Sequence, residues 1–171
     1  MAAGWPAEDD PVWKSLKGGY RCIFNPLPLL RKLCDKPADG KVWAKVWSEL
    51  HHQGDVDSAS YAIAARLIEL RATGVRFDWN FYGFMCAVEL ERHNGRNPPL
   101  PEWLTPLYEA AWGKVTAFCS ADMAAAEDSD QMRVYLSVLA LARGHSDLAY
   151  LLLNVEQSQI AGFRNGELGW G

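Results

Sequence analysis

Apolar side chains recur every three or four residues along most of this chain, which is the spacing that places them on one face of an α-helix. Stretches with glycine or proline interrupt the pattern. The pattern predicts about seven helices, at about residues 26–33, 39–52, 56–72, 77–93, 101–118, 132–143 and 146–155. The sixth is apolar nearly all round, so we expect it to lie at the centre of the fold.

This succession of helices predicts an all-α fold. Helices joined by short breaks pack in antiparallel pairs, which either stack as an α-solenoid of the HEAT or armadillo type or form a helical bundle. No exact sequence repeat separates the two arrangements. We expect one helical domain over residues 26–160, a partly irregular N-terminal extension over 1–25 and a flexible, glycine-rich tail over 161–171.

Composition adds the expectation of an ordinary globular protein. Hydrophobic residues make up 49% of the 171 residues and charged residues 22%. The first residues carry neither the basic nor the apolar region of a secretory signal, and no apolar run is long enough to span a membrane. We therefore expect a cytoplasmic protein without a membrane segment. The four cysteines lie far apart and form none of the close pairs of zinc or redox motifs.

Charge indicates the kind of partner. The formal net charge of −4 makes nucleic acid an unlikely ligand, because phosphate binding needs an excess of lysine and arginine. The charge is also unevenly spread. Residues 14–36 carry six basic and one acidic side chain, whereas residues 121–171 carry seven acidic and three basic ones. The acidic half favours a basic partner.

One polar cluster lies at the predicted turn between the second and third helices. His51 and His52 are residue types that act as bases or bind metals, but neighbouring residues on a helix point about 100° apart and cannot both face one ion. Asp55 or Asp57 is better suited to cap the third helix than to assist a nucleophile. We interpret the cluster as a helix end that can contact a partner. Its predicted contact residues are His51, His52, Gln53, Asp55, Asp57 and Tyr61.

Two further segments are candidates for contact with a partner. Asp78, Trp79 and Tyr82 combine aromatic rings with a hydrogen-bonding group at a helix start, which suits either an interface anchor or a capped helix above core aromatics. The other candidate is the acidic patch of Glu127, Asp128 and Asp130.

The chain lacks the usual catalytic motifs. No phosphate-binding loop, dinucleotide-binding glycine motif, zinc-protease motif or zinc-finger spacing occurs in it. We therefore expect neither enzymatic activity nor a cofactor or metal. The catalytic alternative is a small hydrolase or metal enzyme built around His51, His52 and His93.

One region resembles known proteins. Residues 49–62, ELHHQGDVDSASYA, are followed by Leu-Ile-Glu-Leu at 67–70 and Asp-Trp-Asn-Phe-Tyr at 78–82. These residues resemble a group of bacterial proteins with HEAT-like helical repeats, in which a His-Gln-Gly turn joins two helices and a Ser-Tyr-Ala run opens the second. The resemblance is clearest over residues 43–82 and includes residues 13–20.

Small helical proteins of this group occur beside bacterial toxin genes. The resemblance therefore implies an immunity protein that binds a cognate toxin domain and occludes its active site, without turnover. The alternative is a general helical-repeat scaffold that joins cellular proteins through a concave face. An immunity protein predicts a toxin-like neighbouring gene, whereas a scaffold predicts several partners.

Overall fold

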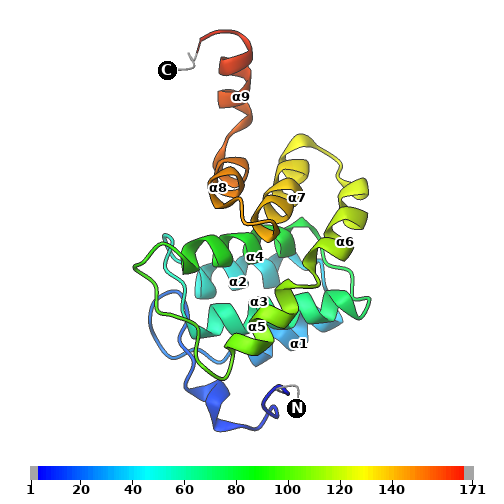
Figure 1. Ribbon diagram of the computed structural model, residues 1–171. Helices are drawn as coiled ribbons and strands as arrows, with labels where there is room; N and C mark the ends of the chain where they lie inside the picture. The colour runs from blue at the N-terminus through cyan, green and yellow to red at the C-terminus, as the bar shows by residue number, and fades with distance from the viewer. Residues whose placement is uncertain (1–3, 168–171) are drawn as a thin grey trace.

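The computed structural model describes residues 4–167, which form nine α-helices and two short 3₁₀ helices. The helices are η1 (Pro11–Lys14), α1 (Leu27–Asp35), α2 (Gly40–Leu50), α3 (Ser58–Ala72), α4 (Trp79–Arg92), α5 (Thr105–Trp112), α6 (Val115–Asp122), η2 (Met123–Ala125), α7 (Ser129–Ala142), α8 (Ser146–Asn154) and α9 (Gln157–Arg164). The predicted all-α fold is confirmed, and the arrangement fits both a helical bundle and a short solenoid (Figure 1). None of the helices in this part of the chain is long and apolar enough to cross a membrane.

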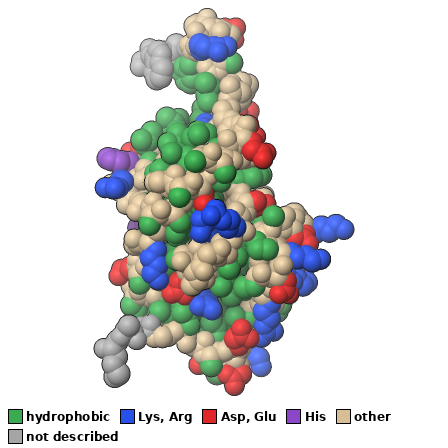
Figure 2. Space-filling model, turned by 90° about the vertical axis from the view of Figure 1, so that its right-hand side faces the viewer, with side chains coloured by type: hydrophobic (Ala, Val, Ile, Leu, Met, Phe, Trp, Pro, Cys, Tyr) green, Lys and Arg blue, Asp and Glu red, His purple; other side chains and the backbone are tan. Residues whose placement is uncertain are grey.

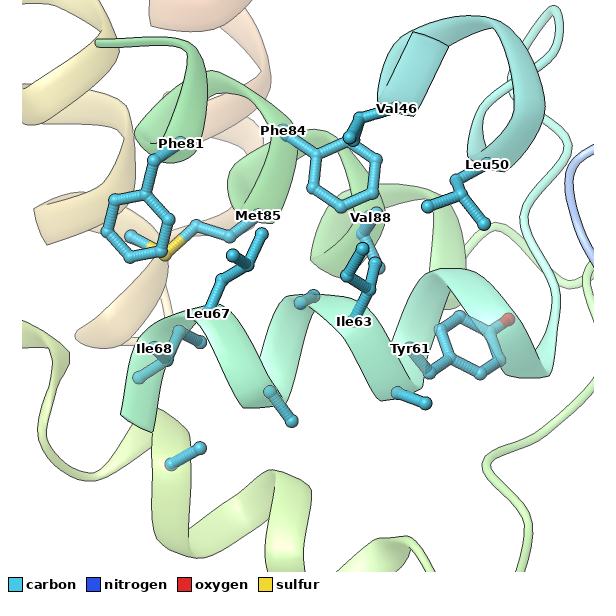
Figure 3. Close-up of a cluster of buried hydrophobic side chains, with 14 of the residues drawn as sticks. Val46, Leu50, Tyr61, Ile63, Leu67, Ile68, Phe81, Phe84, Met85 and Val88 are labelled. Atoms are coloured by element: carbon cyan, nitrogen blue, oxygen red, sulfur yellow. The ribbon is translucent and has the colours of Figure 1, made fainter. Parts of the chain in front are cut away.

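Helix α3 lies at the centre of the fold, and ten of its fifteen residues are buried. It packs against α1, α4, α5 and α6. Its small side chains let neighbouring helices approach closely. The buried alanines are Ala59, Ala62, Ala64 and Ala65. Figure 3 shows Ile63 and Leu67 pointing from α3 toward α4, while Phe84, Met85 and Val88 of α4 point back.

Helix α4 is buried on two sides. All eight residues from Phe81 to Val88 are buried, because α3 covers one side and the α7–α8 pair covers another. Helix α2 closes the same cluster, into which its Val46 and Leu50 point (Figure 3). The layer of α1 to α6 therefore holds most of the hydrophobic core, and α7 and α8 pack onto it through α4.

Helix α7 differs most from the sequence-based expectation. Of its fourteen residues only Tyr135, Ser137 and Val138 are buried, whereas Met132 and Leu136 are exposed. The prediction that this helix is central is therefore wrong. It packs against α4, α6 and α8, and its opposite side faces solvent. The central place belongs to α3, whose alanines allow helices to pack around it.

Two predicted boundaries also change. The single helix expected over 101–118 is interrupted at Gly113 and Lys114 and forms α5 and α6. Helix α9 extends to Arg164, four residues into the segment predicted as a tail, while residues 168–171 lie outside the described chain. The N-terminal extension contains one turn of 3₁₀ helix, and its Trp13 is buried in the core.

A buried ion pair connects α6 to the two central helices. Both oxygens of Asp122 accept hydrogen bonds from Arg71 of α3, at 2.7 and 2.6 Å, and the Tyr82 hydroxyl of α4 donates to the same carboxylate. Arg76 lies 3.3 Å from it at the surface. Burial alone would raise the pKa of Asp122. The hydrogen bonds from Arg71 and Tyr82 and the two arginine charges outweigh burial, so the pKa lies below its ordinary value.

Replacing Arg71 by methionine should lower the free energy of unfolding by about 3 kcal/mol, because the Asp122 carboxylate remains buried without its bidentate partner. The matched control is Arg76→Met, which removes the other arginine from the same carboxylate. The Arg76 side chain is 80% exposed, so its loss should cost at most about 0.5 kcal/mol. Urea unfolding measures both changes, and equal losses would contradict a dominant role for the buried pair.

The same pair should make stability depend on pH. Because the folded-state pKa of Asp122 is depressed, its contribution is present above the unfolded carboxyl pKa of about 3.9 and is lost as the pH falls through the folded value. The difference in stability between the wild type and Arg71→Met should therefore narrow below about pH 4. Urea unfolding at a series of pH values tests this, and a difference that stays constant down to acid would refute it.

Candidate protein-binding surface

His51 and His52 follow helix α2 but face different aromatic rings. His51 is the C-cap residue, and its ring lies edge-on to Trp47 with 5.7 Å between centroids. Burial lowers the pKa of His51, which favours the neutral form of its ring. His52 stacks on Tyr20 at 4.1 Å. The two imidazoles therefore point to separate partners and do not form one site.

Arg21 connects this turn to the N-terminal segment and to the loop between α4 and α5. Its guanidinium donates to Asn97 at 2.7 Å and lies 3.3 Å from Asp55 and 3.6 Å from Asp57. The backbone of Arg21 is left-handed, with φ of 62°. Sequence reasoning missed this residue, because its partners come from distant parts of the chain.

Gly18 and Gly19 let the N-terminal segment lie directly on the backbone of α2. The Gly19 N–H donates to the Glu49 carbonyl at 2.8 Å. A Cβ on Gly18 would collide with that carbonyl, and one on Gly19 would lie 2.8 Å from the backbone nitrogen of His52. Only glycine fits this close approach. The adjacent glycines are the sequence signal that could have indicated the contact.

The buried side chains of Asp57 and Tyr61 stabilise the turn between α2 and α3. Asp57 is the N-cap of α3, one of the two caps expected there, and it forms a capping box with Ser60. The Tyr61 hydroxyl donates to the Pro98 carbonyl at 2.8 Å, and burial raises the pKa of Tyr61 to about 12. Asp57 is 8% exposed and Tyr61 is fully buried. We therefore remove both from the predicted contact surface.

Gln53 and Asp55 remain at the outside of the turn. Gln53 is left-handed, with φ of 50°, and its carbonyl accepts a hydrogen bond from Arg96 at 2.9 Å. Arg96 also lies 3.9 Å from Asp55. Arg21 and Arg96 thus connect the turn to neighbouring segments. The polar side chains of residues 51–61 chiefly stabilise the fold.

His51 also lines a groove between α2, α4 and α8. The groove has a volume of about 280 Å³, and Trp47, Leu90, Tyr150 and Leu153 form its apolar wall. The structure therefore brings the predicted His51 next to α8, a helix that the sequence did not associate with it.

The other two predicted segments meet in space. Trp79, at the start of α4, lines a hollow of about 190 Å³ together with Asp128, Asp130, Gln131 and Val134 from the start of α7. The indole is 43% exposed. The sequence predicted both segments as contact surfaces but gave no reason to place them side by side. Their proximity follows from the packing of α7 on α4.

Asp78 and Tyr82 have structural partners beside this hollow. Asp78 is the N-cap of α4 and accepts hydrogen bonds from the Asn80 backbone and side chain, at 3.0 and 3.2 Å. Burial raises the pKa of Asp78. Tyr82 is fully buried, with its hydroxyl on Asp122. Trp79 is the member of this trio that stays open to a partner, and we remove Tyr82 from the predicted contact surface.

The predicted acidic patch of Glu127, Asp128 and Asp130 lies at the surface. Asp128 is the N-cap of α7 and accepts from the Gln131 N–H at 2.8 Å. Asp130 is 70% exposed and pairs with Arg133 at 2.9 Å. Glu127 is also exposed. All three carboxylates can therefore reach a partner, although two of them also stabilise the first turn of α7.

Most of the exposed large hydrophobic side chains lie on α7 and α8. Nine large hydrophobic side chains are exposed among residues 4–167, and five of them belong to these two helices. We call these five the α7–α8 apolar surface: Met132, Leu136, Leu148, Tyr150 and Leu151. Figure 2 shows hydrophobic side chains gathered at the height that α7 and α8 occupy in Figure 1. Exposed apolar groups concentrated in this way are typical of a binding surface.

Residues of the catalytic alternative are not brought together. His93 pairs with Glu89 at 3.2 Å, whereas His51 and His52 contact Trp47 and Tyr20. Within the described part of the chain, no group of three or more His, Cys, Asp or Glu side chains is arranged to hold a metal ion.

No protein-family model, curated protein or solved structure matches this chain.

Replacing Gly19 by alanine should destabilise the fold by about 2 kcal/mol or more, because the new methyl group meets rigid backbone atoms of the turn. Gly40→Ala is the matched control. Gly40 is the first residue of α2 and has open space around it, so alanine should leave stability unchanged or raise it by up to about 1 kcal/mol. Thermal unfolding compares the two, and a tolerated Gly19→Ala would contradict the close approach.

Proposed function

We propose that this chain is a non-catalytic protein-binding module, an immunity protein that binds a cognate bacterial toxin domain in the cytoplasm and occludes the toxin's active site. The α7–α8 apolar surface carries the proposal. Such a role needs complementary surface only, without cofactor or turnover.

The α7–α8 apolar surface is costly for a chain that acts alone. Leu148 is 49% exposed, Tyr150 60% and Leu151 57%, whereas α3 and α4 bury most of their large apolar side chains. Transfer of such side chains from water to a partner is favourable by roughly 25 cal/mol per Å² of buried apolar area. Binding to another protein gives these residues a physical role.

Charge supports a basic partner. The acidic side chains of the chain's second half include Asp128 and Asp130, which lie at the surface of α7. An interface with an apolar centre and a charged edge combines affinity with fast association. The toxin as partner is supported by the resemblance of residues 43–82 to bacterial helical-repeat proteins of toxin loci.

The direct experiment is to produce the chain together with the product of the adjacent gene. Co-purification in a defined ratio, together with protection of cells from that product, is the expected result. Binding without protection, or recovery with several unrelated proteins instead, would favour a general scaffold over an immunity protein.

Replacing Leu151 by glutamate should weaken binding to the adjacent gene product at least about 30-fold, the effect of removing a central apolar contact and burying a charge. The matched control is Ile23→Glu. Ile23 is 72% exposed in the N-terminal segment, which lies below α2 in Figure 1 and away from α8. Both variants should fold like the wild type. Titration calorimetry gives the affinities, and equal effects of the two variants would argue against the α7–α8 apolar surface.

A further inference from the structure

The hollow between α4 and α7 combines an aromatic face with acidic groups. Trp79 contributes a partly exposed indole, and Val134 forms apolar wall. Asp128, the N-cap of α7, and Asp130, in its first turn, line the same opening. Trp79, Asp128 and Asp130 are exposed, so the hollow opens at the surface.

Both carboxylates retain acceptor capacity. Oδ1 of Asp128 accepts from the Gln131 N–H, and Oδ1 of Asp130 pairs with Arg133. Oδ2 of each makes no hydrogen bond or ion pair with another residue of the range 4–167. Glu127 adds a third acid beside them, so acids outnumber bases three to one over residues 127–133. An incoming cation would therefore meet unused oxygens and an excess of negative charge.

We propose that this hollow receives an arginine side chain of the protein partner. The inference rests on the proposed protein-binding function and adds the chemistry of one contact. The planar guanidinium stacks on the Trp79 indole while its N–H groups donate to Asp128 and Asp130. Tryptophan is the strongest aromatic partner for a cation, and a guanidinium donates in a fork that matches carboxylates.

Other ligands fit this hollow less well. A phosphate would be repelled by the carboxylates, which argues against nucleic acid. Lysine can also lie over an indole, but its compact, strongly hydrated ammonium lacks the planar fork that reaches two carboxylates at once. A neutral aliphatic side chain would leave Oδ2 of both carboxylates without a partner at a contact from which water is removed. Arginine therefore matches the ring and the two acids better than these alternatives.

The test uses the full-length protein and a small probe, N-acetylarginine amide. The indole N–H signal of Trp79, assigned by its loss in Trp79→Leu, is followed in ¹H–¹⁵N spectra together with the backbone amide of Gln131. We expect a saturable shift at roughly tens of millimolar probe, the strength of one cation–π contact and two exposed ion pairs. N-acetylcitrulline amide, which has the same shape without the charge, should bind at least about fivefold more weakly.

Variants then separate the hollow from general charge attraction. Asp128→Ser keeps an N-cap for α7 but removes a charge, and with Asp130→Asn it should weaken binding about fivefold per substitution. Trp79→Leu should abolish the Gln131 shift without any change of charge. Asp147→Asn, an exposed acid in the first turn of α8, should leave binding unchanged.

Three outcomes would overturn the proposal. These are equal binding of citrulline and arginine amides, N-acetyllysine amide binding as tightly as the arginine amide, and an unchanged Gln131 shift in Trp79→Leu. The probe experiment needs no toxin, so its failure leaves the proposed immunity function standing. Conversely, arginine binding without co-purification of the adjacent gene product would contradict the proposed toxin partner but support the arginine-binding hollow.

Discussion

The fold depends on the burial of α3 on nearly all sides. A helix can be surrounded in this way only if its side chains are small enough for neighbours to approach, and the alanines from Ala59 to Ala65 meet that requirement. Ile63 and Leu67 then fill the space toward α4. The positions of α1, α4, α5 and α6 follow from contact with this one helix.

That arrangement leaves α7 and α8 as an outer layer with one covered side. Helix α4 receives them, since its eight-residue buried run from Phe81 to Val88 needs cover opposite α3. Nothing in the described chain covers the other side of the pair to the same degree. The apolar side chains there are therefore exposed, and the proposed partner would cover them.

Two charged residues hold distant parts of the fold together. Arg21 joins the 51–61 turn to the loop before α5, and Asp122 joins α6 to α3 and α4. Both join segments that are distant in the sequence. Buried or half-buried charges of this kind occur with their partners satisfied, so each of these contacts helps to fix how the helices are arranged.

The sequence was sufficient for features that depend on neighbouring residues. Helical periodicity predicted the all-α fold, and Asp57 is one of the two residues expected to cap α3. The sequence was not sufficient where tertiary packing determines which sides of a helix are covered. An apolar helix looks the same whether it is covered on all sides or on one, which is why residues 132–143 were misplaced at the centre.

The same limit applies to the candidate site. Exposed Trp79 and buried Tyr82 stand three residues apart in one aromatic segment, and only the position of α7 and α6 distinguishes them. The hollow shared by Trp79, Asp128 and Asp130 joins two segments predicted separately. Arg21 carried no local signal, because its left-handed backbone and distant partners arise only in the folded chain.

Hydrogen–deuterium exchange of this protein, alone and with the product of the adjacent gene, tests the central claim most directly. The account predicts that added protection concentrates in α7, in α8 and at the start of α4. Protection confined to the turn over residues 51–61, or no change anywhere in the chain, would contradict it.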